Sequence, residues 1–255
     1  MLLTALGTAA GIGRGVATTS FLVDETTLID CGSGVGSLGV EQLEKIERVL
    51  LTHSHLDHCG FIPFLADCHA YRDGPGVTVY SQPETLAALR AHLFSGVLWP
   101  DYTRLPDPAK PWVRLEEITV GEKVQLENGT ATALPAAHSV PGIGWLITGP
   151  KNAFAFTGDT GPCPAFWEAV SRVATLSDIV SEISYRNKDS ANAERFGHLS
   201  AEKLAPLLDG LPDGMRLWIS HLEPGRETEM MAEIRATLPS RLKVDAIRSG
   251  QTIVL

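Results

Sequence analysis

Residues 49–58 carry three histidines and one aspartate directly after an apolar run: His53, His55, Asp57 and His58. Imidazole nitrogens and carboxylate oxygens are the ligands that divalent zinc prefers when thiolates are not used. In an extended segment, residues two apart point to the same side, so His53 and His55 can reach one metal ion. Asp57 and His58 follow where the chain would turn into a helix, and can face a second ion. The simpler alternative is a solvated, histidine-rich turn.

Three further apolar runs also end in a potential metal ligand. His138 follows the run 131–134, Asp159 follows 153–156, and His221 follows 217–219. Strand ends gathered at one edge of a sheet are where α/β proteins build their sites. Taken singly, each residue has an ordinary explanation as a loop histidine or a turn. Together with the first cluster, they supply enough ligands for two metal ions.

The elements that must position these residues are short strands mixed with helices along the whole chain. Patterning predicts an opening hairpin from 17–24 and 26–31, and an irregular insertion over a site at 94–111, which holds Trp99, Tyr102 and four prolines. It predicts further strands at 49–51, 77–80, 131–134, 145–147, 153–156, 179–183 and 217–219, and helices at 40–48, 83–94, 164–174, 201–208 behind a Ser200 cap, and 227–238. This mixture indicates an α/β fold in one domain over residues 1–255.

Composition restricts the class of protein. The chain has 255 residues, of which 44% are hydrophobic and 20% are charged, as in ordinary globular proteins. With 21 Lys and Arg against 30 Asp and Glu, the net charge is −9, which argues against general nucleic-acid or membrane-surface binding. No apolar run approaches the ~18 residues of a membrane span. The four cysteines form no disulfide framework, so we expect a soluble, cytoplasmic protein.

The run His53-Ser54-His55-Leu56-Asp57-His58, followed in order by the three later ligands, resembles the metallo-β-lactamase superfamily over nearly the whole chain. The resemblance implies a four-layer αββα sandwich with a binuclear metal site at one edge. It further implies that one ion is held by His53, His55 and His138 and the other by Asp57, His58 and His221, with Asp159 bridging them. Zinc is the expected metal, and manganese and iron also accept these ligands.

An aspartate at position 159 resembles the thioesterase and phosphodiesterase branches of that superfamily. Two cations about 3.5–4 Å apart can hold the attacking and leaving oxygens of a phosphodiester, and they acidify a bound water into hydroxide. The segments around Glu182 and His198 resemble motifs of the phosphodiesterase branch. That resemblance implies catalytic roles: His198 protonates the leaving oxygen and Glu182 orients His198, beside Asp57 at the metals. The alternative for His198 is an ordinary loop or capping residue.

A finer resemblance is to the class II 3′,5′-cyclic-nucleotide phosphodiesterases. It rests on the histidine motif, on residues 92–101 ending in Trp-Pro-Asp, and on the turn Gly158-Asp159-Thr160-Gly161-Pro162. It implies hydrolysis of a small phosphodiester such as cyclic AMP. Trp99 and Tyr102 could then stack on a purine as substrate-binding residues. Alternatively, these aromatic residues only pack the loop onto the domain.

Other functions remain open at this point. A transfer-RNA 3′-processing endoribonuclease would recruit its substrate with a long basic arm, and the sequence has no basic run of that kind. A thioester or lactone hydrolase would need only the metal site, and Glu182 and His198 would then be dispensable. A non-catalytic metal-binding module predicts missing ligands, and none is missing. The resemblance is also compatible with a homodimer.

Overall fold

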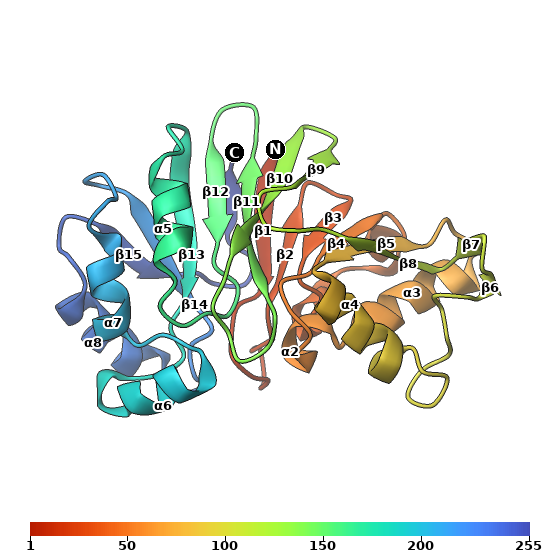
Figure 1. Cartoon of the computed structure of the whole chain (residues 1–255), viewed down its shortest axis with the longest axis horizontal. Coiled ribbons are helices and arrows are strands. Elements are labelled where there is room, and N and C mark those ends of the chain that lie inside the picture. Colours follow the sequence, from red (N-terminus) through yellow and green to blue (C-terminus); the bar gives the residue numbers. More distant parts are fainter.

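Neighbouring residues on one strand face different apolar cores, and this alternation builds the layers of the fold. Just before the histidine cluster, Val49 packs into an outer core and Leu50 into the core between two sheets. In the other sheet, Ile179 packs outward and Val180 inward. Because side chains alternate along a strand, each sheet is buried on both faces. The computed structural model describes residues 1–255, and it shows two sheets packed face to face with helices on both outer sides (Figure 1).

Each of the two main sheets has seven strands. The first has the order β16-β1-β2-β3-β4-β5-β8, formed by β16 (Thr252–Val254), β1 (Leu2–Gly7), β2 (Ser20–Val23), β3 (Thr27–Ile29), β4 (Arg48–Leu50), β5 (Val77–Ser81) and β8 (Val113–Glu117). The second has the order β15-β14-β13-β12-β11-β10-β9, formed by β15 (Lys243–Ala246), β14 (Arg216–Ser220), β13 (Leu176–Glu182), β12 (Ala153–Phe156), β11 (Ile143–Thr148), β10 (Gly129–Pro135) and β9 (Lys123–Leu126). A small hairpin pairs β6 (Pro106–Asp107) with β7 (Lys110–Pro111).

The helices are short and lie on the outer faces of the sheets. They are α1 (Val40–Leu43), α2 (Leu56–Cys59), α3 (Ile62–Tyr71), α4 (Pro83–Ala88), α5 (Pro164–Ser171), α6 (Ser190–Phe196), α7 (Ala201–Leu204) and α8 (Glu227–Thr237). Figure 1 shows α3 and α4 beside the first sheet and α5, α7 and α8 beside the second. Single turns of 3-10 helix cover Ser33–Ser37, Asn187–Asp189 and Ala205–Leu208, and a π-helical turn extends α4 over Leu89–Leu93. The predicted αββα sandwich is therefore confirmed.

The direction of the strands places the candidate metal ligands at one edge of the sandwich. β3, β4, β5 and β8 run parallel to one another, and so do β12, β13, β14 and β15. The carboxyl ends of parallel strands lie at the same edge of a sheet. His53 follows β4, Asp159 follows β12 and His221 follows β14. β10 points the same way as β12, because β11 between them is antiparallel to both, so His138 after β10 reaches that edge too.

Two predicted elements differ in detail. The helix expected at 40–48 ends at Leu43, because Arg48 already pairs with Thr27 and Thr78 in the sheet. Ser200 does precede α7, but its hydroxyl makes no cap and instead donates to Ser190 Oγ at 3.1 Å.

Patterning missed helix α3, since Pro63 in its sequence reads as a break. A proline in the first turn is tolerated because the amide there needs no partner within the helix. Among all the helices, none has the length and apolar composition needed to cross a membrane.

Candidate metal centre

The seven candidate ligands converge at the sheet edge in two overlapping groups. The first group holds His53, His55, His138 and Asp159, and the second holds Asp57, His58, Asp159 and His221. Within each group, the potential ligand atoms lie within 4.8 Å of one another. Asp159 belongs to both groups, so one carboxylate borders two possible metal positions.

Asp159 lies between histidines from both groups. Its Oδ2 lies 3.8 Å from His53 Nε2 and 3.3 Å from His221 Nε2, while its Oδ1 lies 3.3 Å from His58 Nε2. The tight turn before it depends on Gly158, which has a φ of +61°. A Cβ at Gly158 would also lie 3.1 Å from the Thr52 side chain. Glycine at 158 therefore lets the turn pack against the histidine loop.

Buried polar atoms without partners indicate what this edge is built to hold. Three such atoms are His53 Nε2, His58 Nε2 and Asp159 Oδ1. Leaving buried polar groups unpaired costs free energy, so native proteins nearly always satisfy them. Nitrogen and carboxylate donors facing one another at these distances suit divalent cations of the zinc class. The residues present therefore fit a pair of such ions.

Hydrogen bonds on the far side of the rings fix which nitrogen faces the cluster. Asp30 is fully buried, and its Oδ2 accepts from His58 Nδ1 at 2.6 Å and from the Thr52 hydroxyl at 2.9 Å. Because the Thr52 hydroxyl donates to Asp30, it accepts from His53 Nδ1, which lies 2.9 Å away. Both histidines therefore carry their proton on Nδ1 and turn Nε2 toward the cluster.

Asp30 holds this arrangement with both carboxylate oxygens, since its Oδ1 also accepts the Thr52 amide at 2.7 Å. An Asp30→Asn variant retains one acceptor oxygen for three donors. We expect its metal affinity to fall roughly 10–100-fold, measured by competition with a chromophoric chelator. Unchanged affinity in a folded Asp30→Asn protein would contradict the orienting role.

His138 is oriented by backbone. Its Nδ1 donates to the Gly197 carbonyl at 2.7 Å, which leaves Nε2 at 3.1 Å from His55 Nδ1. Gly197 has a φ of +70°, and a Cβ there would lie 2.6 Å from the Ser139 amide nitrogen. Only glycine allows this close approach.

Glu182 and His198 form a third group next to the second one. His198 Nδ1 donates to Glu182 Oε1 at 2.9 Å. Glu182 Oε2 accepts the Ser184 hydroxyl at 2.8 Å, and this hydroxyl in turn accepts from His221 Nδ1 at 2.8 Å. One buried carboxylate thus orients His198 directly and His221 through Ser184.

Burial and neighbouring charges set the protonation of these groups. Burial lowers the pKa of His53 well below its usual range. Burial raises the pKa of Asp159, but the charges of His221 and His58 outweigh it and hold this pKa well below its usual value. Burial lowers the pKa of His198, but the hydrogen bond and charge of Glu182 outweigh it and leave this pKa raised. A neutral His53 and an ionised Asp159 are the forms that bind a metal.

Trp99 and Tyr102 of the 94–111 loop pack against helix α3. The Tyr102 hydroxyl donates to Asp67 Oδ1 at 2.6 Å, and its side chain is 9% exposed. The Trp99 ring lies 4.8 Å from that of Phe64, between ring centres. This placement favours loop packing over base stacking, above all for Tyr102.

Tyr102→Phe separates these two roles. If Tyr102 anchors the loop, the variant loses about 1–2 kcal/mol of unfolding free energy, measured by urea denaturation, with KM unchanged. A raised KM at wild-type stability would instead assign Tyr102 to the substrate.

Sequence reasoning did not single out Asp30, Thr52 and Ser184 as parts of the site. Asp30 has a φ of +56°, unusual for a residue other than glycine, and it follows strand β3 at the same edge as His53. An aspartate at the end of an apolar strand was the available signal for it. Thr52 and Ser184 carry no local signal, because their role depends on which histidine ring lies opposite.

A family model for the beta-lactamase superfamily domain matches residues 26–222, more than half of the chain and including every candidate ligand. The chain belongs to the metallo-β-lactamase superfamily.

Relatives place this metallo-β-lactamase superfamily member in the phosphodiesterase and nuclease branch. A probable 3′,5′-cyclic-nucleotide phosphodiesterase of Yersinia pestis is 26% identical over 205 residues, which cover 71% of this chain and 58% of that protein. A ribonuclease Z of Bradyrhizobium sp. (strain ORS 278) is 25% identical over 269 residues, which cover 84% of this chain and 85% of that protein. The chain spans less than two thirds of the length of the first curated relatives that it matches.

Solved structures share the architecture. The crystal structure of unliganded yeast PDE1 superposes with a TM-score of 0.82 at 16% identity, over 100% of this chain and 99% of that one. At this identity the superposition establishes the fold.

Proposed function

We propose that this metallo-β-lactamase superfamily member is a binuclear-metal hydrolase of small phosphodiesters, with a 3′,5′-cyclic nucleotide such as cyclic AMP as substrate. The observation that carries the proposal is the carboxylate of Asp159 shared by two histidine groups, with the Glu182–His198 pair beside them. Similarity to the Yersinia cyclic-nucleotide phosphodiesterase supports the substrate class.

In this proposal His53, His55 and His138 would hold one divalent ion, Asp57, His58 and His221 would hold the other, and Asp159 would be shared by the two groups. Zinc is the metal we propose, with manganese or iron as alternatives, since all accept these ligands. When bound, the two ions acidify a water molecule into a nucleophile and neutralise phosphate charge. The local cationic charge lets an anionic substrate approach a chain whose net charge is −9.

His198 is the proposed general acid. Breaking the phosphodiester leaves an alkoxide, which needs a proton as the P–O bond opens. Glu182 accepts from His198 Nδ1, so the ring stays protonated and presents Nε2 to the leaving oxygen. Asp57 is the third catalytic residue that we propose, and its Oδ2 lies 3.2 Å from His221 Nε2. These residues hold and deliver protons at defined atoms.

A ribonuclease of the ribonuclease Z type is the second candidate. Similarity to the Bradyrhizobium enzyme over 84% of this chain favours it, because the same ligands and the same acid would cleave an RNA phosphodiester. The net charge of −9 favours the small substrate, since RNA binding relies on cationic contacts to phosphate.

The test incubates zinc- or manganese-loaded protein with 3′,5′-cyclic AMP and, separately, with a precursor transfer RNA. Formation of adenosine monophosphate that depends on added metal would support the proposal. Cleavage of the RNA with cyclic AMP untouched would assign the second candidate. If neither is cleaved and a thioester or lactone is, phosphodiester chemistry is wrong for this site.

A further inference from the structure

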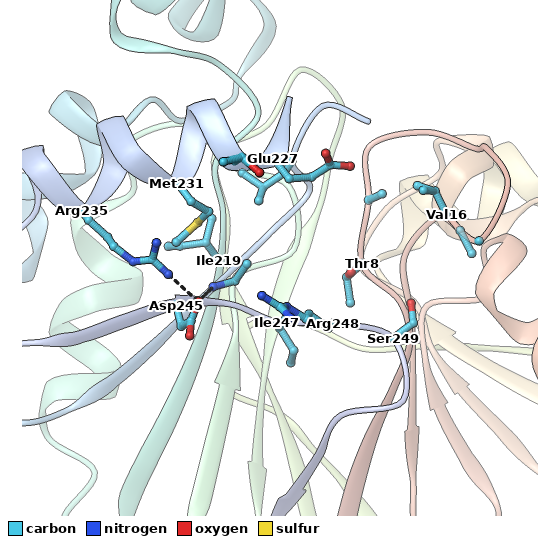
Figure 2. Close-up of a pocket in the computed structure, with 16 residues that line it drawn as sticks. Thr8, Val16, Ile219, Glu227, Met231, Arg235, Asp245, Ile247, Arg248 and Ser249 are labelled. Carbon is cyan, nitrogen blue, oxygen red and sulfur yellow. Dashed lines mark hydrogen bonds and ion pairs between the residues drawn. The ribbon is translucent and has the colours of Figure 1, made fainter. Parts of the chain in front are cut away.

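A cavity lies next to the candidate metal centre, at the same edge of the sandwich, and none of the seven candidate metal ligands lines it. Its volume is about 520 Å³. It is bounded by the loop after β1 on one side and by α8 and the end of β15 on the other (Figure 2). Its apolar walls include Val16, Ile219, Leu222, Met231 and Ile247. This space can take a small organic molecule with an apolar body.

Of the four charged residues that line the cavity, two form an ion pair with each other and two, Glu227 and the exposed Arg248, form none. Arg235 Nη2 donates to Asp245 Oδ1 at 2.7 Å, which neutralises both groups. Glu227 begins helix α8, and its Oε1 accepts the Gly225 amide at 3.0 Å. The Arg248 guanidinium lines the cavity and makes no hydrogen bond or ion pair within the chain. Figure 2 shows Arg248 between the Met231 side and the Thr8 side of the cavity.

We propose that this cavity binds a small amphipathic monoanion, with its carboxylate or similar group on Arg248 and its apolar body against Met231, Ile219 and Leu222. A guanidinium is the natural partner of a carboxylate, because its planar fork can donate two parallel hydrogen bonds. Arg248 is an exposed guanidinium without a carboxylate partner in a cavity with apolar lining, and this combination favours a ligand with one negative charge and an apolar chain. A polyanion would meet only one arginine free of a carboxylate partner, Arg248, and would also meet the unpaired carboxylate of Glu227.

The cavity lies directly behind a candidate metal ligand. The His221 amide donates to the Thr8 carbonyl at 2.7 Å, and the Ala10 amide donates to the Leu222 carbonyl at 3.2 Å. Thr8 and Leu222 line the cavity. Backbone hydrogen bonds thus join the wall of the cavity to His221, which has a φ of +59°. The two sites are neighbours but have separate lining residues.

The test measures binding of octanoate to the metal-loaded protein by isothermal titration calorimetry, with 1-octanol and octylammonium as neutral and cationic matches. We expect octanoate to bind more tightly than either match, and butanoate to bind more weakly by roughly two- to fourfold per missing methylene. Arg248→Gln should weaken octanoate binding at least about tenfold. Arg90→Gln, which removes an exposed arginine elsewhere, should leave it unchanged.

Four results would overturn the proposal. Octanoate that binds Arg248→Gln as tightly as wild type lies elsewhere, for example on the metal ions. Equal binding of 1-octanol means that only the apolar wall matters. Tighter binding of octylammonium assigns the cavity to cations through Glu227. Absence of binding by all probes shows that the cavity takes no ligand of this size and shape.

Discussion

Replacing Asp159 by alanine is expected to abolish turnover and to lower metal content at both positions. Its oxygens lie 3.3 Å from His58 and His221 and 3.8 Å from His53, so its loss removes a ligand from both groups at once. It also leaves several histidines close together without the negative charge between them. Bound metal ions of this kind would supply several kcal/mol of transition-state stabilisation, so the expected loss in kcat/KM is about 10³-fold or more.

Metal content by mass spectrometry of the dialysed protein and kcat/KM on cyclic AMP together check this result. Asp178→Ala is the matched control, because Asp178 is also fully buried and binds Arg216 and Trp218 at a distance from the cluster. That variant should lose stability while the folded fraction keeps its metal. Full metal content in Asp159→Ala would show that Asp159 bridges nothing.

Replacing His198 by alanine is expected to lower kcat by roughly 10²–10⁴-fold while metal content stays near that of wild type. The reason is that His198 is expected to donate a proton, whereas the residues of the two ligand groups are expected to hold the metal ions. His198 binds Glu182 through Nδ1 and is a member of neither four-residue ligand group, whereas His221 is a member of the second. A general acid matters most when the leaving group is poor. A substrate with a nitrophenolate leaving group should therefore lose much less rate than a cyclic nucleotide.

His69→Ala is the control for this experiment. His69 is buried, and its Nε2 bonds to the Ile46 carbonyl and to none of the candidate site residues. It should lower stability without changing kcat of the folded enzyme. Equal losses of metal and activity in His198→Ala would assign His198 a structural or ligand role. An unchanged rate on both substrates would favour thioester or lactone chemistry, for which this acid is dispensable.

The amino-acid sequence was sufficient to predict the candidate metal ligands that lie close together along the chain. Four candidate ligands lie close together in the sequence: His53, His55, Asp57 and His58. Their position directly after an apolar run predicts both the strand and the metal ligands that follow it. The predicted strands at 153–156 and 217–219 were correct because their apolar residues face two buried sides. The fold class followed from that mixture of strands and helices. The edge strands β8, β9, β15 and β16 were missed, since three to five residues at the edge of a sheet carry little patterning, and β1 between β16 and β2 was missed as well.

The tertiary structure decides which of these residues contact and orient one another. Strand order is set by packing of the inner core, where Phe21 meets Phe154 and Phe156 from the other sheet. Only that packing brings the turn at Asp159 between two sets of histidines. It likewise places Asp30 behind His58, which is 28 residues away. The sequence alone determined which ligands were available and that they lie at strand ends, because ligand type and strand alternation are local properties. Three features depend on contacts between distant segments: the sharing of Asp159 by two ligand groups, the tautomers of the histidines, and the cavity behind His221. Those contacts exist only once the two sheets have packed.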